Sequence, residues 1–161
     1  MCPLIRRLLF NMYGNQKFQV RWNNCLSDMY KMTNGVKQGA VLSPILFTMY
    51  IDGLFYELKR TCVGCHINQE FAGAFGYADD IVLLSPSLDA LKHSITICEN
   101  YAKRFHILFN PIKSKLMCFN VDNTDIIFNL CNQPVSIIEH DIYLGNVIVT
   151  DIFDRSIIHT V

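Results

Sequence analysis

The spacing of hydrophobic residues changes several times along this chain and predicts an alternation of helices and short strands. Residues 3–13 carry apolar side chains at helical spacing, and Gly14 is a typical helix stop. Two short runs typical of strands, 17–22 and 29–33, lie on either side of the pair Asn23-Asn24, which is typical of a turn. The first part of the chain is therefore expected to form a helix followed by a β-hairpin.

Two longer helices are predicted from the same spacing. Ser43 is a typical N-cap and Pro44 a typical first helical residue, so a helix should begin there and run to about Lys59. Its expected apolar stripe contains Ile45, Leu46, Met49, Tyr50, Gly53, Leu54 and Leu58. Ser87 should cap the next helix. The residues expected on its apolar face are Leu88, Leu91, Ile95, Cys98, Ala102 and Phe105.

The remaining segments predict short strands. Residues 72–78 and 81–84 should form a hairpin joined at Asp79-Asp80. Further strands are expected near 107–109, 115–119, 126–128, 135–138 and 142–149. This order favours an α+β fold, a small antiparallel sheet with helices packed on one face. No repeat or linker divides the chain, so one domain over residues 1–161 is expected.

The composition is that of a globular domain with one core. Hydrophobic residues make up 51% and charged residues only 17% of the 161 positions. No run of roughly eighteen apolar residues predicts a membrane span, and the first residues lack the pattern of a secretion signal. The seven cysteines are expected to be reduced core thiols. We therefore expect an intracellular protein of the cytoplasm or nucleus, not secreted and without a membrane partner.

The net charge of zero hides a gradient along the chain. Residues 1–60 hold eight Lys and Arg against three Asp and Glu, residues 61–120 hold five against five, and residues 121–161 hold one against six. The basic first third suits a partner with a phosphate backbone, and an ordinary solvated surface explains it equally well. Nucleic-acid binding through this third should be weak and electrostatic.

Two adjacent aspartates interrupt the apolar run FGYADDIVLLS, residues 75–85. One interpretation of Asp79 and Asp80 is a plain turn, where Asp is common. A structural turn would more often contain Asn-Gly or Asp-Gly, and neighbouring carboxylates repel each other unless a cation intervenes. A divalent metal ion removes the repulsion, and two such ions drive in-line nucleotidyl transfer. The second interpretation is a magnesium site on a hairpin tip between buried strands.

The segment GVKQGAVLSPILF, residues 35–47, places a glycine on each side of Val-Lys-Gln just before a helix. The glycines allow close approach of the backbone, Lys37 adds a positive charge, and the amide of Gln38 could contact a base edge. A loop that only precedes and caps the helix is the simpler interpretation.

The segment NPIKSK, residues 110–115, predicts a turn between two strands and carries Lys113 and Lys115. A lysine beside a phosphate can stabilise charge or donate a proton. Lysines in such turns are more often simply solvated. Both interpretations stay open on the residues alone.

The segment CVGCH, Cys62 to His66, matches the pattern of c-type haem attachment and could also supply three zinc ligands. The sequence has no export signal and no convincing second haem ligand. It also lacks a second close pair of Cys or His residues. An ordinary loop is therefore the favoured interpretation.

Together these segments resemble the reverse transcriptase domain of non-LTR retrotransposons, the long interspersed elements. GVKQGAVLSPILFTMYIDGL is similar to motif B of that family, FGYADDIVLL to motif C with its Tyr-x-Asp-Asp box, FNPIKSKLMCF to motif D and IYLGNVI to motif E. The box alone is weak, but its combination with the QG-x-x-LSP-x-LF pattern upstream is specific. The CVGCH segment falls between motifs B and C, in a connecting hairpin.

The resemblance implies the palm of an RNA-directed DNA polymerase. Such an enzyme uses two Mg²⁺ ions and deoxynucleoside triphosphates to extend a DNA primer on an RNA template. By position, Asp79 would bind metal with the help of Asp80, and Tyr77 and Ala78 would lie beneath the primer end and the new base pair.

The other motifs imply further roles. Gln38 and Gly39 would line the template and nucleotide pocket. Lys113 would donate a proton to the pyrophosphate leaving group. Leu144 and Gly145 would belong to the primer grip.

One departure from the family pattern concerns motif A, whose metal-binding Asp should precede the helix at 3–13. The carboxylates upstream of motif C are Asp28, Asp52, Glu57 and Glu70, and none lies in an apolar strand of that type. The expectation is a fragment with motifs B to E, without fingers, motif A or thumb. It is either a polymerase palm completed by other segments or an inactive remnant that at most binds nucleic acid weakly. A haem or zinc module on CVGCH is the third alternative.

Overall fold

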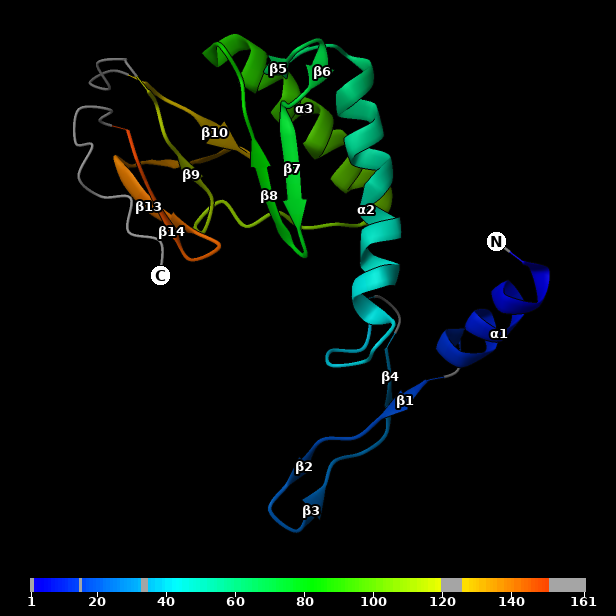
Figure 1. Ribbon diagram of the computed structural model, residues 1–161. Coiled ribbons are helices and arrows are strands. Elements are labelled where there is room, and N and C mark those ends of the chain that lie inside the picture. The colour runs from blue at the N-terminus through cyan, green and yellow to red at the C-terminus, as the bar shows by residue number, and fades with distance from the viewer. Residues whose placement is uncertain (1, 15, 33–34, 120–125, 151–161) are drawn as a thin grey trace. The chain divides into compact units, whose positions relative to one another are not determined.

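The computed structural model describes residues 2–14, 16–32, 35–119 and 126–150 (Figure 1). The chain forms two compact units, Met1–Tyr50 and Ile51–Val161. No helix within the described ranges is long and apolar enough to cross a membrane. The site residues expected from the sequence are divided between the two units, with Gln38 and Gly39 in the first and the others in the second.

The first unit contains the predicted helix and hairpin. Helix α1 spans Pro3–Gly14 and ends at the expected glycine. The hairpin consists of β1 (Lys17–Phe18), β2 (Arg21–Trp22), β3 (Cys25–Leu26) and β4 (Tyr30–Lys31). Strand β1 pairs with β4 and β2 with β3, both antiparallel, around the Asn23-Asn24 turn. Thr33, at the end of the second expected strand, lies outside the described residues.

Helix α2 spans Ser43–Arg60, close to the predicted bounds, but Ser43 is not its cap. The first helical hydrogen bond runs from Leu46 N to Leu42 O, at 2.9 Å, so the helix begins one residue earlier than expected. The Ser43 hydroxyl instead donates to the Lys37 carbonyl. Ser43 therefore holds the preceding loop against the helix instead of satisfying a free N–H group.

The predicted apolar stripe of α2 is buried only in its second half. Leu54 and Leu58 are 0% and 1% exposed, and Ile51, which the stripe omitted, is 5% exposed. Its other members Ile45 and Met49 are each 56% exposed. Helical periodicity marks one face along the whole helix, but burial also requires a neighbouring element to cover that face.

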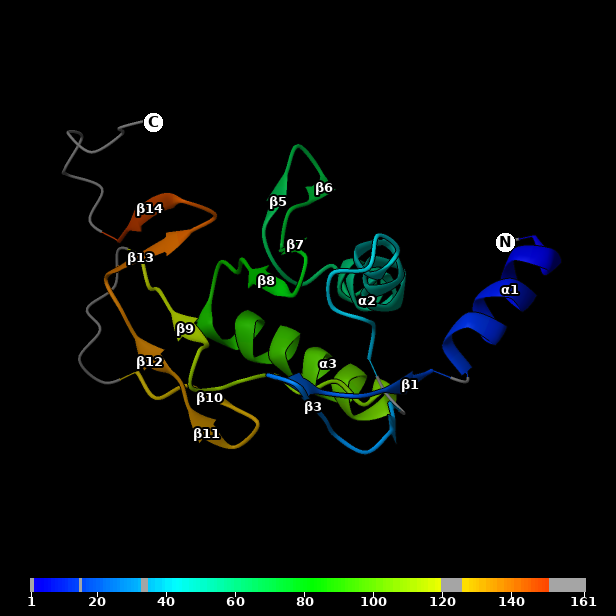
Figure 2. The same ribbon diagram turned by 90° about the horizontal axis from the view of Figure 1, so that it is seen from below.

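Helix α3, Leu88–Phe105, is the element that lies against the second half of α2 (Figure 2). Ser87 caps it as predicted, because its Oγ accepts a hydrogen bond from Ala90 N at 3.3 Å. A Cβ atom added to Gly53 would lie 2.8 Å from the Tyr101 hydroxyl oxygen, so the two helices approach closely there. An ion pair between Glu57 and Arg104 joins them further along.

Two hairpins follow α2 in the chain. They contain β5 (His66–Ile67), β6 (Glu70–Phe71), β7 (Ala74–Tyr77) and β8 (Asp80–Leu83). Strand β5 pairs with β6 and β7 with β8, both antiparallel. A backbone hydrogen bond from Cys65 N to Leu84 O, 3.1 Å, connects the two hairpins, and one from Ala72 N to Cys65 O, 2.8 Å, extends the β5–β6 pair.

The C-terminal part of the second unit is built from short strands around a small core. They are β9 (Lys115–Leu116), β10 (Asn129–Leu130), β11 (Gln133–Pro134), β12 (Ser136–Ile137), β13 (His140–Tyr143) and β14 (Asn146–Val149). The buried core residues are Leu116, Phe128, Leu130 and Val135, and Leu88, Leu91 and Ile95 of α3 pack against them. The first half of the apolar face predicted for α3 thus covers this core.

The predicted fold class, α+β with helices and a small antiparallel sheet, is confirmed, and the described strands form two-stranded sheets. Every described strand pairs with a single partner, and all pairs are antiparallel except β9 with β12. Several strand predictions are wrong in detail. Residues 107–109 and 126–128 are not strands, and the expected strand 142–149 is broken into a hairpin. Residues 107–109 and 126–128 have the apolar residues of a strand but are not paired as strands, whereas residues of 142–149 belong to two strands that pair with each other.

The expectation that the cysteines are core thiols holds only in part. All seven are free, but only Cys98 is buried; Cys65 and Cys118 are half-buried, and Cys2, Cys25, Cys62 and Cys131 are exposed. Burial raises the pKa of the Cys98 thiol to about 12. Cys98 is therefore a small apolar core residue and an unreactive one.

Candidate active site

The two adjacent aspartates lie at the tip of the β7–β8 hairpin, but the turn begins one residue earlier than predicted. Gly76 pairs with Ile81 and Tyr77 with Asp80, so the two loop residues are Ala78 and Asp79. The prediction that Asp79-Asp80 forms the turn is therefore wrong by one position. Asp79 belongs to the turn, whereas Asp80 is the first residue of β8. The register of the flanking strands decides this, and no local propensity reveals it.

Ala78 has a backbone conformation that residues with a Cβ atom rarely adopt. Its φ is 51°, and the following residue Asp79 has no positive φ. This sign pattern belongs to the two-residue hairpin turn in which glycine is usual at the first position. A left-handed residue other than glycine costs on the order of 1 kcal/mol and occurs often at functional sites. The turn thus carries strain directly beside the two carboxylates.

The hairpin tip is open to solvent. Asp79 and Asp80 are exposed, Tyr77 is 63% and Phe75 is 48% exposed, and the half-buried residues of the hairpin are Ala74 of β7 and residues 81–83 of β8. The expectation that both flanking strands are buried is therefore wrong for β7. One face of this two-stranded hairpin is covered, and the carboxylates are accessible on its tip.

Phe55 of α2 supports the hairpin from the covered side. A Cβ atom added to Gly76 would lie 2.5 Å from Phe55 Cζ, so the ring lies directly against the backbone of β7. This contact joins the hairpin to the buried half of α2, two residues before the turn. Sequence reasoning missed Phe55, because nothing in its local pattern distinguishes it from other apolar helix residues.

Gln38 and Gly39 form the centre of a tight turn in the first unit. Ala40 N donates to Lys37 O at 3.2 Å, and Gly39 has φ 78°. These features define a turn that requires glycine at its third position. Ser43 N donates to Ala40 O at 3.0 Å and so links the turn to the start of α2. The turn presents the exposed Gln38 side chain directly before a helix N-terminus.

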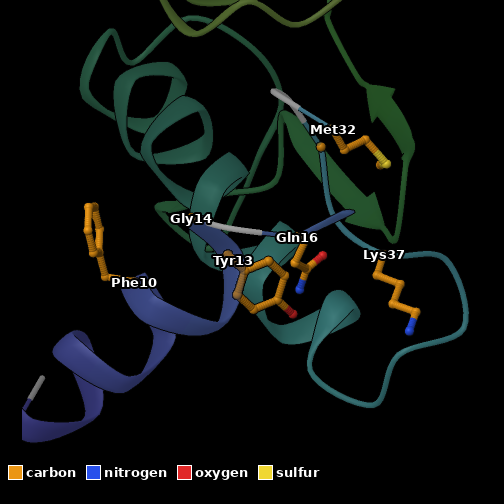
Figure 3. Close-up of a pocket in the computed structure, with 7 residues that line it drawn as sticks. Phe10, Tyr13, Gly14, Gln16, Met32 and Lys37 are labelled. Carbon is orange, nitrogen blue, oxygen red and sulfur yellow. The ribbon is translucent and has the colours of Figure 1, made fainter. Parts of the chain in front are cut away.

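A cavity of about 320 Å³ lies beside this loop, within the first unit (Figure 3). It is lined by Phe10, Tyr13, Gly14, Gln16, Met32, Gly35 and Lys37. Figure 3 shows Tyr13 close to Gln16, while Lys37 extends from the loop that precedes α2. Of these residues, sequence reasoning singled out Gly35 and Lys37 as part of a candidate binding segment.

The two lysines of NPIKSK differ in their surroundings. Asn110 folds the segment into a turn, because its Oδ1 accepts hydrogen bonds from Ile112 N at 3.1 Å and Lys113 N at 3.3 Å. Lys115, in β9, donates to Asp141 Oδ1 of β13 at 2.6 Å. Lys113 is exposed and forms no ion pair within the described ranges. Lys113 is thus the lysine available to an external phosphate.

The Lys115–Asp141 pair should make part of the stability sensitive to acid. The hydrogen bond from Lys115 holds the pKa of the Asp141 carboxyl below its ordinary value, with help from the Ile142 backbone. A carboxyl group whose pKa is lower in the folded state than in the unfolded state stabilises the fold at pH values above its unfolded-state pKa. This contribution is lost as the pH falls through its folded-state pKa. We expect Lys115→Met to raise the NMR titration midpoint of Asp141. An unchanged midpoint would show that the pair does not form in solution.

Leu144 and Gly145 form the two-residue turn between β13 and β14. Tyr143 pairs with Asn146, and both turn residues have positive φ, 50° for Leu144 and 82° for Gly145. Two positive φ values match the right-handed twist of the strands, but a branched residue such as leucine is unusual there. The predicted primer-grip residues are therefore the tip of a second, partly strained hairpin, with Leu144 50% exposed.

The CVGCH segment connects α2 to the first hairpin. Cys62 lies in the turn after α2 and His66 begins β5. A Cβ atom on Gly64 would lie 3.1 Å from Gly73 Cα and 3.3 Å from Leu84 O, so two backbones meet there. No three His, Cys, Asp or Glu side chains in the described part of the chain are grouped to hold a metal ion. The glycine, with its close backbone contact, gives the segment a structural role.

Gly64→Ala should therefore destabilise the second unit. Gly64 has φ 125°, which no Cβ-bearing residue adopts easily, and two of the three atoms nearest to an added Cβ atom belong to the backbone and cannot move aside. We expect a loss of roughly 1–3 kcal/mol in the free energy of unfolding, measured by chemical denaturation. Gly14→Ala is the control, because a Cβ atom there would have no neighbour within 4 Å. Equal stability of the two variants would contradict the close backbone contact.

The chain belongs to the reverse transcriptase (RNA-dependent DNA polymerase) family, whose model matches residues 1–145. The relatives that it matches include proteins of mobile elements. It is 30% identical over 95 residues to the retrovirus-related Pol polyprotein from type-1 retrotransposable element R2 of Nasonia vitripennis, which covers 59% of this chain and 9% of that protein. It is 26% identical over 131 residues to the RNA-directed DNA polymerase from mobile element jockey of Drosophila funebris. That match covers 78% of this chain and 13% of the relative.

A third relative is the probable RNA-directed DNA polymerase from transposon X-element of Drosophila melanogaster, 25% identical over 120 residues. The predicted resemblance to the reverse transcriptases of non-LTR retrotransposons is therefore confirmed. The matched regions make up only 9% to 13% of the length of these relatives.

Proposed function

We propose that this chain contributes the palm of an RNA-directed DNA polymerase, in which Asp79 and Asp80 bind the catalytic metal ions. The observation that carries the proposal is the exposed pair of carboxylates on a two-residue hairpin turn with a strained Ala78. Family membership over residues 1–145 supports it. Strain and two carboxylates that form no ion pair with a described residue are unfavourable for a purely structural turn.

The donor set fits magnesium. Adjacent carboxylates on an exposed tip offer the hard oxygen atoms that Mg²⁺ prefers, and the tip leaves room for water and phosphate oxygens. Bound Mg²⁺ would supply the positive charge that stabilises the attacking and leaving oxygens of nucleotidyl transfer. The contribution of the protein is to hold Asp79 and Asp80 in place, through the turn and the contact of Phe55 with Gly76.

The residues around these carboxylates would place the substrates. Tyr77 pairs across the hairpin with Asp80 and is exposed, so it and Ala78 can contact the primer end and the new base pair. Gln38 and Gly39 would contact the template and the incoming deoxynucleoside triphosphate. The glycine-dependent turn that exposes the Gln38 amide supports this role.

Two further segments would act on the nucleotide and the primer. Lys113 is the lysine of its turn that has no ion pair among the described residues, which suits a proton donor to pyrophosphate. Leu144 and Gly145 would form the primer grip, at the exposed tip of β13–β14. The partners would be an RNA template, a DNA primer and deoxynucleoside triphosphates.

A specific observation favours the alternative, a remnant without activity. Within the described ranges, no third carboxylate, His or Cys joins Asp79 and Asp80 in a metal-binding group. Magnesium needs near-octahedral coordination and binds weakly to an incomplete set of ligands. The isolated chain is therefore expected to extend no primer.

Primer extension separates the two proposals. The assay follows a DNA primer on an RNA template with Mg²⁺ or Mn²⁺, first with this chain and then with a longer polypeptide that contains it. Activity that appears only in the longer polypeptide and requires Asp79 supports the polymerase. Inactivity of both supports the remnant. Extension by the isolated chain, abolished by Asp79→Ala, would show that two carboxylates suffice.

A further inference from the structure

The hairpin of residues 17–31 is a two-stranded ribbon (Figure 1). Several of its apolar side chains are exposed. Trp22 is 78%, Met29 65%, Leu26 63% and Val20 53% exposed. Two-stranded hairpins are only marginally stable without a covering surface. An exposed tryptophan beside other apolar side chains therefore indicates a surface that another molecule covers.

The charge of this hairpin identifies the kind of molecule. Its ionisable side chains include Lys17, Arg21 and Lys31, against the single carboxylate Asp28. Lys17 lies directly opposite Lys31 in the β1–β4 register. None of the ion pairs in the described part of the chain involves these three cations. Like charges at directly opposed positions destabilise a hairpin, and an anion bound between them removes the repulsion.

The aromatic rings of the hairpin are interleaved with these cations. Trp22 follows Arg21 in β2, directly before the Asn23-Asn24 turn. Phe18 and Tyr30, adjacent to the lysine pair, stack with their ring centroids 6.1 Å apart. Cations that follow a phosphate backbone, combined with exposed aromatic rings that stack on bases, characterise proteins that bind single-stranded nucleic acid.

We infer that the 17–31 hairpin binds single-stranded nucleic acid, with Trp22 stacked on a base and Lys17, Arg21 and Lys31 on the phosphates. The inference rests on the proposed function in so far as a polymerase handles a single-stranded template, but the contact itself requires neither metal nor Asp79. The strand must be single, because the faces of bases inside a duplex are already stacked. A second copy of the chain is disfavoured as the occupant, because it would bring the same three cations.

Trp22 is the only tryptophan of the chain, so its fluorescence reports this contact directly. We expect single-stranded oligouridylate or oligothymidylate to quench Trp22 emission in the full chain, without metal or nucleotide. The logarithm of the affinity should fall with that of the salt concentration, with a slope of roughly −2, because each of three neutralised phosphates contributes about −0.7. The RNA and DNA oligonucleotides together show which sugar the site prefers.

Substitutions test the stacking separately, by anisotropy of a labelled oligonucleotide. Trp22→Ala should weaken binding roughly 5- to 150-fold, the range for loss of one stacked base, and Trp22→Phe should retain most of the affinity. Tyr56→Ala is the matched control, since Tyr56 is an exposed aromatic residue of α2, 63% exposed. This control should bind like the unsubstituted chain.

The inference is overturned if a duplex quenches Trp22 as strongly as the single strand, or if Trp22→Ala binds normally. A change of Trp22 emission with protein concentration alone would assign the surface to a second copy and also overturn it. Asp79→Ala must leave the quenching unchanged. A variant that loses primer extension but keeps the quenching therefore has its defect at the β7–β8 hairpin, and a variant that loses the quenching but keeps extension has its defect at the 17–31 hairpin.

Discussion

Substituting Asp79 with alanine should abolish primer extension in an active reverse transcriptase polypeptide that contains this chain. Asp79 is the loop residue that follows the strained Ala78, at the accessible tip of β7–β8. Removing a group that stabilises developing charge costs on the order of 10²–10³-fold in rate, and loss of a metal ligand should cost at least that much. The rate is measured with a DNA primer on an RNA template in the presence of Mg²⁺ or Mn²⁺.

Two controls separate a metal-binding role from a structural one. Asp52→Ala removes another exposed carboxylate of the same unit, from α2, and should leave extension nearly unchanged. Binding of Mn²⁺ to the isolated chain should be weaker in Asp79→Ala than in Asp52→Ala, without any difference in unfolding. Equal Mn²⁺ binding by both variants would refute a metal site at Asp79.

Leu54→Ala should destabilise the second unit by roughly 2–5 kcal/mol, the usual range for removal of a buried leucine. Leu54 is fully buried, like Leu58. It lies on the half of α2 that packs against α3 and the β7–β8 hairpin. Such a loss is a large fraction of the 5–15 kcal/mol typical of a whole domain. Chemical denaturation measures it as a lower midpoint.

Met49→Ala is the matched control, because Met49 lies on the same predicted stripe of α2 but is 56% exposed. An exposed helix position should change stability by no more than about 0.5 kcal/mol, since alanine is a good helix former. If both variants lose several kcal/mol, the first half of α2 is buried in solution and the described exposure is wrong.

Local sequence patterns predicted the elements whose determinants are also local. Helix α3 begins after Ser87, whose hydroxyl oxygen accepts a hydrogen bond from the N–H group of Ala90, only three residues further along the chain. Helix α1 ends at Gly14, as the glycine predicted. The family was recognisable because its motifs are runs of adjacent residues, such as the Tyr-x-Asp-Asp box at Tyr77. These features depend on contacts between neighbours in the chain.

Gly145 is typical of a turn, but the apolar residues on both sides of it predicted a single strand. Residues 142–149 contain enough apolar residues for a single strand, yet the structure turns at Leu144-Gly145. The competing influences were strand propensity and turn chemistry, and the pairing of β13 with β14 decided between them.

The sequence by itself determined the class of fold, the helices, the place of the acidic pair on a hairpin and the family. Only the tertiary structure decided which half of α2 is buried, that the turn contains Ala78 instead of Asp80, and that Phe55 supports Gly76. Periodicity specifies which residues share a face, because it follows from the geometry of one element. Burial, register and backbone strain depend on which distant segment lies opposite, and a local pattern does not contain that information.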